Sequence, residues 1–291
     1  MLKSLQKAFK VKEVRDRLLY TFMMLVVIRI GCCLPIPGVD PSYLHDFFSN
    51  LQNSGMGFFN AITGGSFSSM SIFALSITPY ITSSIIMQLL TIAIPKLEEM
   101  QKDGEDGRKK IAEYTRYLTV GLALFESCAM AVGLGGKGLL LEDHRNIWGY
   151  LTVVAAMTAG SALLMWIGER ITDNGVGNGI SIVLLINIVS GTPQDMMTLY
   201  ERFMAGRSVA VATVSGIIVL AIIVAIVVFV LVLNDAERRI PVQYSKKMQG
   251  RRMIGGQSTY IPLKVNTANV IPVIFASSIM SMPVMIAQFF H

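Results

Sequence analysis

The chain has 291 residues, of which 53% are hydrophobic and 15% are charged, and its mean hydropathy is +0.56. A soluble domain carries about 25% charged residues, so this composition excludes an ordinary cytosolic enzyme, a disordered chain and a collagen-like repeat. The three cysteines and three histidines lack the spacing of metal ligands or of a disulfide framework. The composition therefore predicts an integral membrane protein.

Apolar segments long enough to cross a membrane recur along the chain. A bilayer core about 30 Å thick needs roughly 20 apolar residues in a helix. The predicted spans, in chain order, are 18–35, 71–94, 117–136, 147–167, 180–191, 209–233 and 265–290. The uncharged span 209–233 by itself excludes a soluble protein. The weakest prediction is 180–191, which is short and follows three closely spaced glycines.

The net charge of +6 is distributed unevenly between the loops. Six Lys and Arg residues precede the first span, and the loops 95–116, 168–179 and 234–264 hold 6, 1 and 7. The alternate loops together hold only 4. Basic loops stay on the cytoplasmic side of a membrane, so the amino terminus is predicted to be cytoplasmic. Because the last span meets no polar tail, the sequence is expected to be part of a larger membrane protein.

One stretch departs from a simple series of spans. Residues 47–95 form a run of 49 without a charge, which glycines at 55, 57, 64 and 65 and serines at 66, 68 and 69 interrupt. A glycine-rich break at membrane depth is tolerated only where protein or a water-filled cavity covers it. The pattern predicts a short re-entrant helix beside a pore or cavity, and a surface loop with some apolar residues is the alternative.

No catalytic constellation is present in the sequence. The motif GVGNG at 175–179 lacks both a preceding strand and the register of a phosphate-binding loop. No Ser–His–Asp or Cys–His set lies at membrane depth. We therefore predict neither an enzymatic activity nor a metal or cofactor.

Five long motifs resemble the bacterial SecY family, whose members are channel subunits of the protein-conducting translocon. The motifs are RIGCCLPIPGVD (29–40), FNAITGGSFSSMSIFALSITPYITSSIIMQLL (59–90), GEDGRKKIAEYTRY (104–117), GERITDNGVGNGISI (168–182) and QGRRMIGGQSTYIPLKVNTANVIPVIFASSI (249–279). The resemblance implies an all-α fold: a polytopic membrane helix bundle with a re-entrant plug helix and an inverted repeat. Residues 1–191 would form the first five-span half, and 192–291 would begin the second.

The resemblance assigns two sets of residues to the pore. The plug would be about 57–69, with small uncharged side chains that leave and return easily. Its predicted members are Asn60, Thr63, Gly64, Gly65 and Ser66. The constriction would be an aliphatic ring of Ile77, Ile81, Ile180, Leu184 and Ile274, which resists ions by dewetting. Spacing by four residues places both members of each pair on one helix face, although isoleucines that face lipid or pack against a neighbouring helix are the alternative.

Two further sets follow from the same resemblance. Thr82, Glu126 and Asn266 would form the polar cluster of a lateral gate, and a structural hydrogen-bond cluster is the alternative. In the basic segment 234–264, Lys246, Lys247, Arg251 and Arg252 would dock the ribosome, whose RNA phosphates suit arginine, or the SecA motor ATPase. A basic segment that only sets topology and attracts anionic lipid is the alternative.

The sequence thus predicts the central pore-forming subunit of the Sec translocon in the bacterial inner membrane. It would conduct unfolded preproteins across the membrane and release apolar segments into lipid. The implied partners are SecE, SecG, SecA, the ribosome, signal sequences and nascent chains. A secondary transporter is one alternative, because it would use a similar broken helix. It should carry ionisable residues near the break, and residues 47–95 contain none with a charge. A non-conducting membrane scaffold is the other alternative.

Overall fold

The computed structural model describes residues 11–40, 63–134, 140–141, 145–242, 247–249, 252–254 and 259–267, with the single residues 272, 276 and 280. The chain divides into two compact units: Met1–Pro193 with Phe275–His291, and Gln194–Ile274. The helix α9 (Gly179–Phe203) crosses the border, with Pro193 inside it. Each unit is described by itself.

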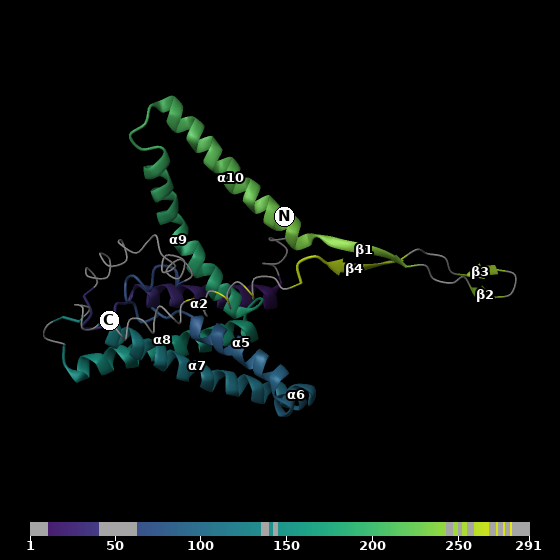
Figure 1. The fold of residues 1–291 in the computed structure, drawn as a ribbon, viewed down its shortest axis with the longest axis horizontal. Helices are drawn as coiled ribbons and strands as arrows, with labels where there is room; N and C mark the ends of the chain where they lie inside the picture. The colour runs from purple at the N-terminus through teal and green to yellow at the C-terminus, as the bar shows by residue number, and fades with distance from the viewer. Residues whose placement is uncertain are drawn as a thin grey trace. The chain divides into compact units, whose positions relative to one another are not determined.

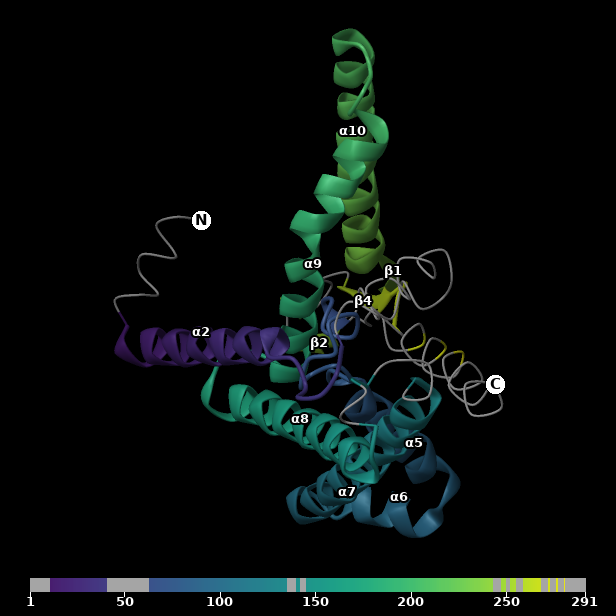
Figure 2. The ribbon, with the colours of Figure 1, turned by 90° about the vertical axis from the view of Figure 1, so that its left-hand side faces the viewer.

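The first unit is a helix bundle. Its helices are α2 (Lys12–Cys33), α5 (Thr78–Ala93), α6 (Pro95–Lys102), α7 (Glu105–Leu134), α8 (Ile147–Asn174) and the first part of α9. The helix α8 packs against α2, α5 and α7, and α5 also packs against α7; Figures 1 and 2 show α7 and α8 side by side. Among the described residues, α8, α9 and α10 are each long and apolar enough to cross a membrane.

Local sequence sets where several helices begin and end. Ile94 precedes Pro95 and is extended, as the residue before a proline tends to be, so the axis bends by 103° between α5 and α6. Asn178 begins α9, where its Oδ1 accepts hydrogen bonds from the amides of Ile180 at 3.0 Å and Ser181 at 3.3 Å, as an N-cap does.

Two exposed tryptophans lie along α8. Trp148 is near its start and Trp166 is eight residues before its end, and their separation of 18 positions corresponds to about 27 Å of helix. That length is close to the thickness of a bilayer core, at whose two surfaces tryptophan is enriched. Arg170 lies over the Trp166 ring, 5.4 Å from its centroid. The placement supports a membrane-spanning α8.

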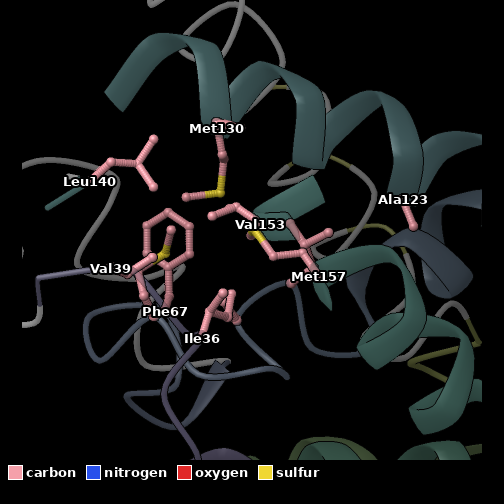
Figure 3. Packing of buried hydrophobic residues seen from close by; sticks show 12 residues of the cluster. Ile36, Val39, Phe67, Ala123, Met130, Leu140, Val153 and Met157 are labelled. Carbon is pink, nitrogen blue, oxygen red and sulfur yellow. The ribbon is translucent and has the colours of Figure 1, made fainter. Parts of the chain in front are cut away.

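Two apolar clusters form the core of the first unit. One joins the chain that follows α2 to residues 67–75, α7 and α8, with Ile36, Val39, Phe67, Met130 and Met157 among its members (Figure 3). The second joins α2, α8 and α9 around Phe73 and Ile77. Residues 63–77, which we call the buried segment, contribute side chains to both clusters.

The second unit contains the end of α9, α10 (Val209–Asp235) and a β ribbon. The strands are β1 (Glu237–Val242), β2 (Lys247–Gln249), β3 (Arg252–Ile254) and β4 (Thr259–Lys264). β1 pairs antiparallel with β4, and β2 with β3, so the ribbon leads away from the end of α10, with β2 and β3 at its far end (Figure 1). Arg239 lies 4.7 Å from the Tyr260 ring centroid.

The structure departs from the predicted spans. Helices α6 and α7 cover most of the predicted loop 95–116, and α8 continues to Asn174. α5 begins at Thr78 and not at Ser71, because residues 71–77 belong to the buried segment. α9 has 25 residues, more than the predicted 180–191. The basic segment 234–264, predicted as a loop between spans, carries the four strands. Residues of the predicted span 265–290 lie mostly outside the described residues.

Candidate functional site

The backbone of the buried segment pairs with the residues that directly follow α2. The amide of Ile36 donates to the Met70 carbonyl at 3.0 Å, and the amide of Ile72 donates to the Leu34 carbonyl at 3.0 Å. Pro35 and Ser71 form an antiparallel bridge between these bonds. Backbone groups away from water need such partners, so this pairing lets an irregular segment lie inside a helix bundle.

The apolar side chains of the buried segment are almost wholly removed from the surface. Met70, Ala74, Leu75 and Ile77 are each 0% exposed, and Phe67 is 3% exposed. Phe67 lies among Met130, Leu140 and Val153 in Figure 3. Residues 63–77 therefore fill the space between helices and are not a surface loop. They are built mostly of turns, so the predicted re-entrant helix is not seen over 64–69, and residues 57–62 lie outside the described residues.

Two serine hydroxyls of the segment donate to backbone carbonyls within it. The Ser71 hydroxyl donates to the Ser66 carbonyl at 3.2 Å, and the Ser68 hydroxyl donates to the Gly65 carbonyl at 2.9 Å. Gly64 and Gly65 have φ of +67° and +79°, the left-handed region that glycine enters at little cost. Among the predicted plug residues, Thr63 and Ser66 are buried, whereas Asn60 lies outside the described residues.

A second feature is an aliphatic cluster directly after the buried segment. Ile77 is a buried member of it, and Ile81, Ile180 and Leu184 are half-buried against it. Two of them pack against Gly168 of α8, because a Cβ placed there would lie 3.4 Å from Ile77 Cδ1 and 3.6 Å from Ile180 Cγ1. The structure thus brings four of the five predicted ring residues together, and Ile274 lies outside the described residues.

The predicted gate residues fall in both units. Thr82 and Glu126 lie on the packed helices α5 and α7, and each is 6% exposed. The Thr82 hydroxyl donates to the Thr78 carbonyl at 3.1 Å, while Glu126 Oε2 has no hydrogen-bond partner among the described residues. Asn266 belongs to the second unit. The shared gate role of these residues stays a prediction.

The predicted docking residues lie at the far end of the β ribbon. Lys247 is the first residue of β2, and Arg252 is the first of β3 and pairs with Gln249. Lys246 and Arg251 lie outside the described residues. An antiparallel ribbon separates these positions from α10 by the length of β1 and β4, so they can meet a partner away from the membrane-spanning helix.

The sequence reasoning missed a polar group on α9. Asn187 is 1% exposed and its Nδ2 donates to the Ser76 hydroxyl at 2.9 Å. Arg29 of α2 donates from Nη1 to the Ser190 hydroxyl at 2.8 Å. The available signal was an asparagine and a serine within an otherwise apolar predicted span, because polar residues in a span usually face the bundle interior.

The family comparisons agree on one family. A family model described as SecY matches residues 71–291. Similar curated proteins are the protein translocase subunits SecY of Streptomyces scabiei, 46% identical over 99% of this chain and 68% of that protein, and of Pseudomonas aeruginosa, 42% identical over 96% and 62%. The SecY of Corynebacterium glutamicum is 44% identical over 97% of this chain and 64% of that protein.

Solved structures show the same architecture. A protein-conducting channel superposes with a TM-score of 0.56 at 20% identity, covering 94% of this chain and 58% of that chain. Sec61 in a canine ribosome–channel complex superposes with a TM-score of 0.54 at 20% identity, covering 94% and 59%. These likenesses confirm the predicted all-α membrane-channel fold, to which the structure adds the β ribbon.

Proposed function

Because the chain belongs to the SecY family, we propose that it forms the pore region of a translocon that passes unfolded preproteins across the bacterial inner membrane. It spans between 62% and 68% of the length of the curated relatives described above. The observation that carries the proposal is the buried segment, which fills the interior of a helix bundle beside a cluster of aliphatic side chains.

The geometry suggests how such a conduit stays closed. The buried segment is the stopper, and it overlaps the predicted plug, about 57–69, over residues 63–69. The cluster of Ile77, Ile81, Ile180 and Leu184 supplies the constriction. An aliphatic constriction excludes ions because water in it is unstable, yet branched side chains yield to a peptide without breaking any hydrogen bond.

A lateral exit is the second part of the proposal. Thr82, Glu126 and Asn266 line the seam through which signal sequences and apolar segments enter lipid. Glu126 Oε2 is buried and has no hydrogen-bond partner among the described residues, which supports this role. A polar group at membrane depth favours an arrangement that brings a hydrogen-bond partner to it.

The β ribbon is proposed as the cytoplasmic docking element for SecA or the ribosome, and the amino terminus as cytoplasmic. The cations Arg238, Arg239, Lys247, Arg252 and Lys264 lie on its strands. Arginine and lysine bind RNA phosphates and acidic surfaces. SecE and SecG are proposed as companion membrane subunits. No group of this chain is assigned to the hydrolysis of a nucleotide, so energy for transport would come from the docked partner.

The experiment is a crosslink from the constriction to a translocating chain. Ile77→Cys or Ile81→Cys in the full-length protein, assembled with its partners, should crosslink to a stalled preprotein. Ile92→Cys is the matched control on the same helix, because Ile92 is 80% exposed. Crosslinks from 77 and 81 but not from 92 support the conduit. Their absence from an assembled complex that holds a stalled chain would contradict it and favour a scaffold.

A further inference from the structure

A chain of hydrogen bonds joins α2, α9 and the buried segment. Arg29 Nη1 donates to the Ser190 hydroxyl at 2.8 Å, and that hydroxyl donates to the Asn187 carbonyl at 2.7 Å. Asn187 Nδ2 then donates to the Ser76 hydroxyl at 2.9 Å. The chain therefore connects a charged side chain of the first helix to the end of the buried segment.

The link between Asn187 and Ser76 is shielded from the surface. Both residues are 1% exposed, and no group in the described part of the chain donates a hydrogen bond to Asn187 Oδ1. An amide removed from solvent loses its hydrogen bonds to water, so the bond to Ser76 is the compensation that Asn187 has within the described residues. Breaking the bond between Asn187 and Ser76 without a replacement leaves a buried polar group unpaired, which is unfavourable. The bond therefore restrains the position of Ser76.

The other end of the buried segment meets the same turn of α9. A Cβ placed on Gly64 would lie 2.7 Å from the Asn187 carbonyl oxygen and 2.9 Å from Ser190 Oγ. Such a close approach is open only to glycine. One turn of α9 thus contacts the segment at residue 64 and at residue 76, which are its two ends.

The backbone of Ser76 is itself unfavourable. Its φ is +53°, a region that residues with a Cβ rarely enter. Such conformations persist only where surrounding interactions hold them, and Asn187 supplies one of these interactions. If the bond to Asn187 were lost, Ser76 would be free to return to an ordinary backbone conformation, and the end of the segment would move.

We propose that Arg29, Ser190 and Asn187 form a polar clamp that holds the buried segment in the closed position. The clamp rests on the proposed function, in which that segment is the stopper. It is reversible, because its hydroxyl and amide groups can bond to water or to a passing peptide when the segment leaves. Arg29 orients the Ser190 hydroxyl and so is a positioning residue, not merely a charge that reaches the membrane surface.

The test measures the resting leak of iodide through the full-length protein, assembled with its partners in vesicles. Loss of one hydrogen bond shifts the closed–open ratio by about five-fold, so Asn187→Ala and Ser76→Ala should each raise the leak by roughly that factor. Their double variant should leak no more than either single one, because both remove the same bond. Ser190→Ala should leak, and Ser190→Thr, which keeps the hydroxyl, should not.

Ser127→Ala is the matched control. The Ser127 and Thr158 hydroxyls share a hydrogen bond of 2.9 Å between α7 and α8, away from the clamp, so its loss should destabilise the bundle without raising the leak. A leak as large in Ser127→Ala as in Asn187→Ala, or additive effects of Asn187→Ala and Ser76→Ala, would overturn the clamp and leave a general packing effect.

Preprotein transport in the same vesicles separates the two proposals. If the wild type transports preprotein but the leak stays at its level in Asn187→Ala, the clamp is wrong and the conduit stands. If the wild type transports nothing and its constriction gives no crosslink, the proposed function itself is wrong.

Discussion

Gly160 of α8 packs directly against the backbone of the buried segment, where there is no room for a Cβ. A Cβ added there would lie 2.0 Å from the Ile72 carbonyl oxygen and 2.8 Å from the Ile72 carbonyl carbon. Because both atoms belong to the backbone, no side-chain rotation relieves the contact. In Gly160→Ala, the buried segment must therefore retreat from α8 by about 1 Å to reach the closest approach that a Cβ tolerates.

The change in the free energy of unfolding of Gly160→Ala follows from two opposing effects. Overpacking a filled interior costs about 1–3 kcal/mol, while replacing glycine by alanine in a helix returns up to about 1 kcal/mol. Gly121 of α7 supplies the matched control, because a Cβ there meets nothing within 4 Å. Gly121→Ala should be neutral or stabilising, so the two variants should differ by about 1–3 kcal/mol in their free energy of unfolding.

The assay is thermal or denaturant unfolding in detergent micelles, followed by the resting iodide leak in vesicles. Gly160→Ala should unfold at a lower temperature than Gly121→Ala and should leak more, because the displaced Ile72 belongs to the stopper. If both variants unfold alike and neither leaks, the contact between Gly160 and the buried segment does not exist as described.

Three further predictions concern the constriction, an ion pair and a span. Ile77→Asn places an amide in a wholly buried apolar site at a cost of about 1–3 kcal/mol, and should raise the iodide leak, whereas Ile77→Leu should not. Arg116 of α7 and Glu169 of α8 form an ion pair at 2.8 Å, with side chains 49% and 23% exposed. A double-mutant cycle with Arg116→Gln and Glu169→Gln should therefore give a coupling energy below about 1 kcal/mol. A larger coupling energy would mean that the pair is buried in the assembly. Ile222→Asp near the middle of α10 should weaken membrane insertion by about 2.5–3.5 kcal/mol in a glycosylation-mapping assay, while Ile222→Leu inserts like the wild type; equal insertion of both would contradict a spanning α10.

Hydropathy predicted the helices because length and apolar content are local properties of the chain. The uncharged run 209–233 became α10, which has no buried residue, as expected of a helix whose side chains face lipid or a partner. The start of α5 could not be found in this way. Residues 71–77 are as apolar as the helix that follows. Ser71 and Ile72 instead pair with the backbone around Pro35, a contact that no local pattern encodes.

The candidate site was predicted in part for the same reason. Spacing by four placed Ile77 beside Ile81, but the meeting of Ile77 with Ile180 across Gly168 depends on how α8 packs. The β ribbon was missed because β1 has a proline and two arginines and lacks the alternation of a half-buried strand. The role of Asn187 depends on Ser76, 111 residues away, and could be found only from the fold.

A disulfide that locks the buried segment tests the central claim most directly. The Cys32 thiol lies against the Ser66 hydroxyl, so Ser66→Cys should crosslink to Cys32 on oxidation. Preprotein transport should then stop and should return after reduction. Ser69→Cys, at an exposed position, and Ser66→Cys combined with Cys32→Ser should be unaffected by the oxidant. Full transport through a channel whose residues 32 and 66 are completely joined would contradict a stopper that must leave its place.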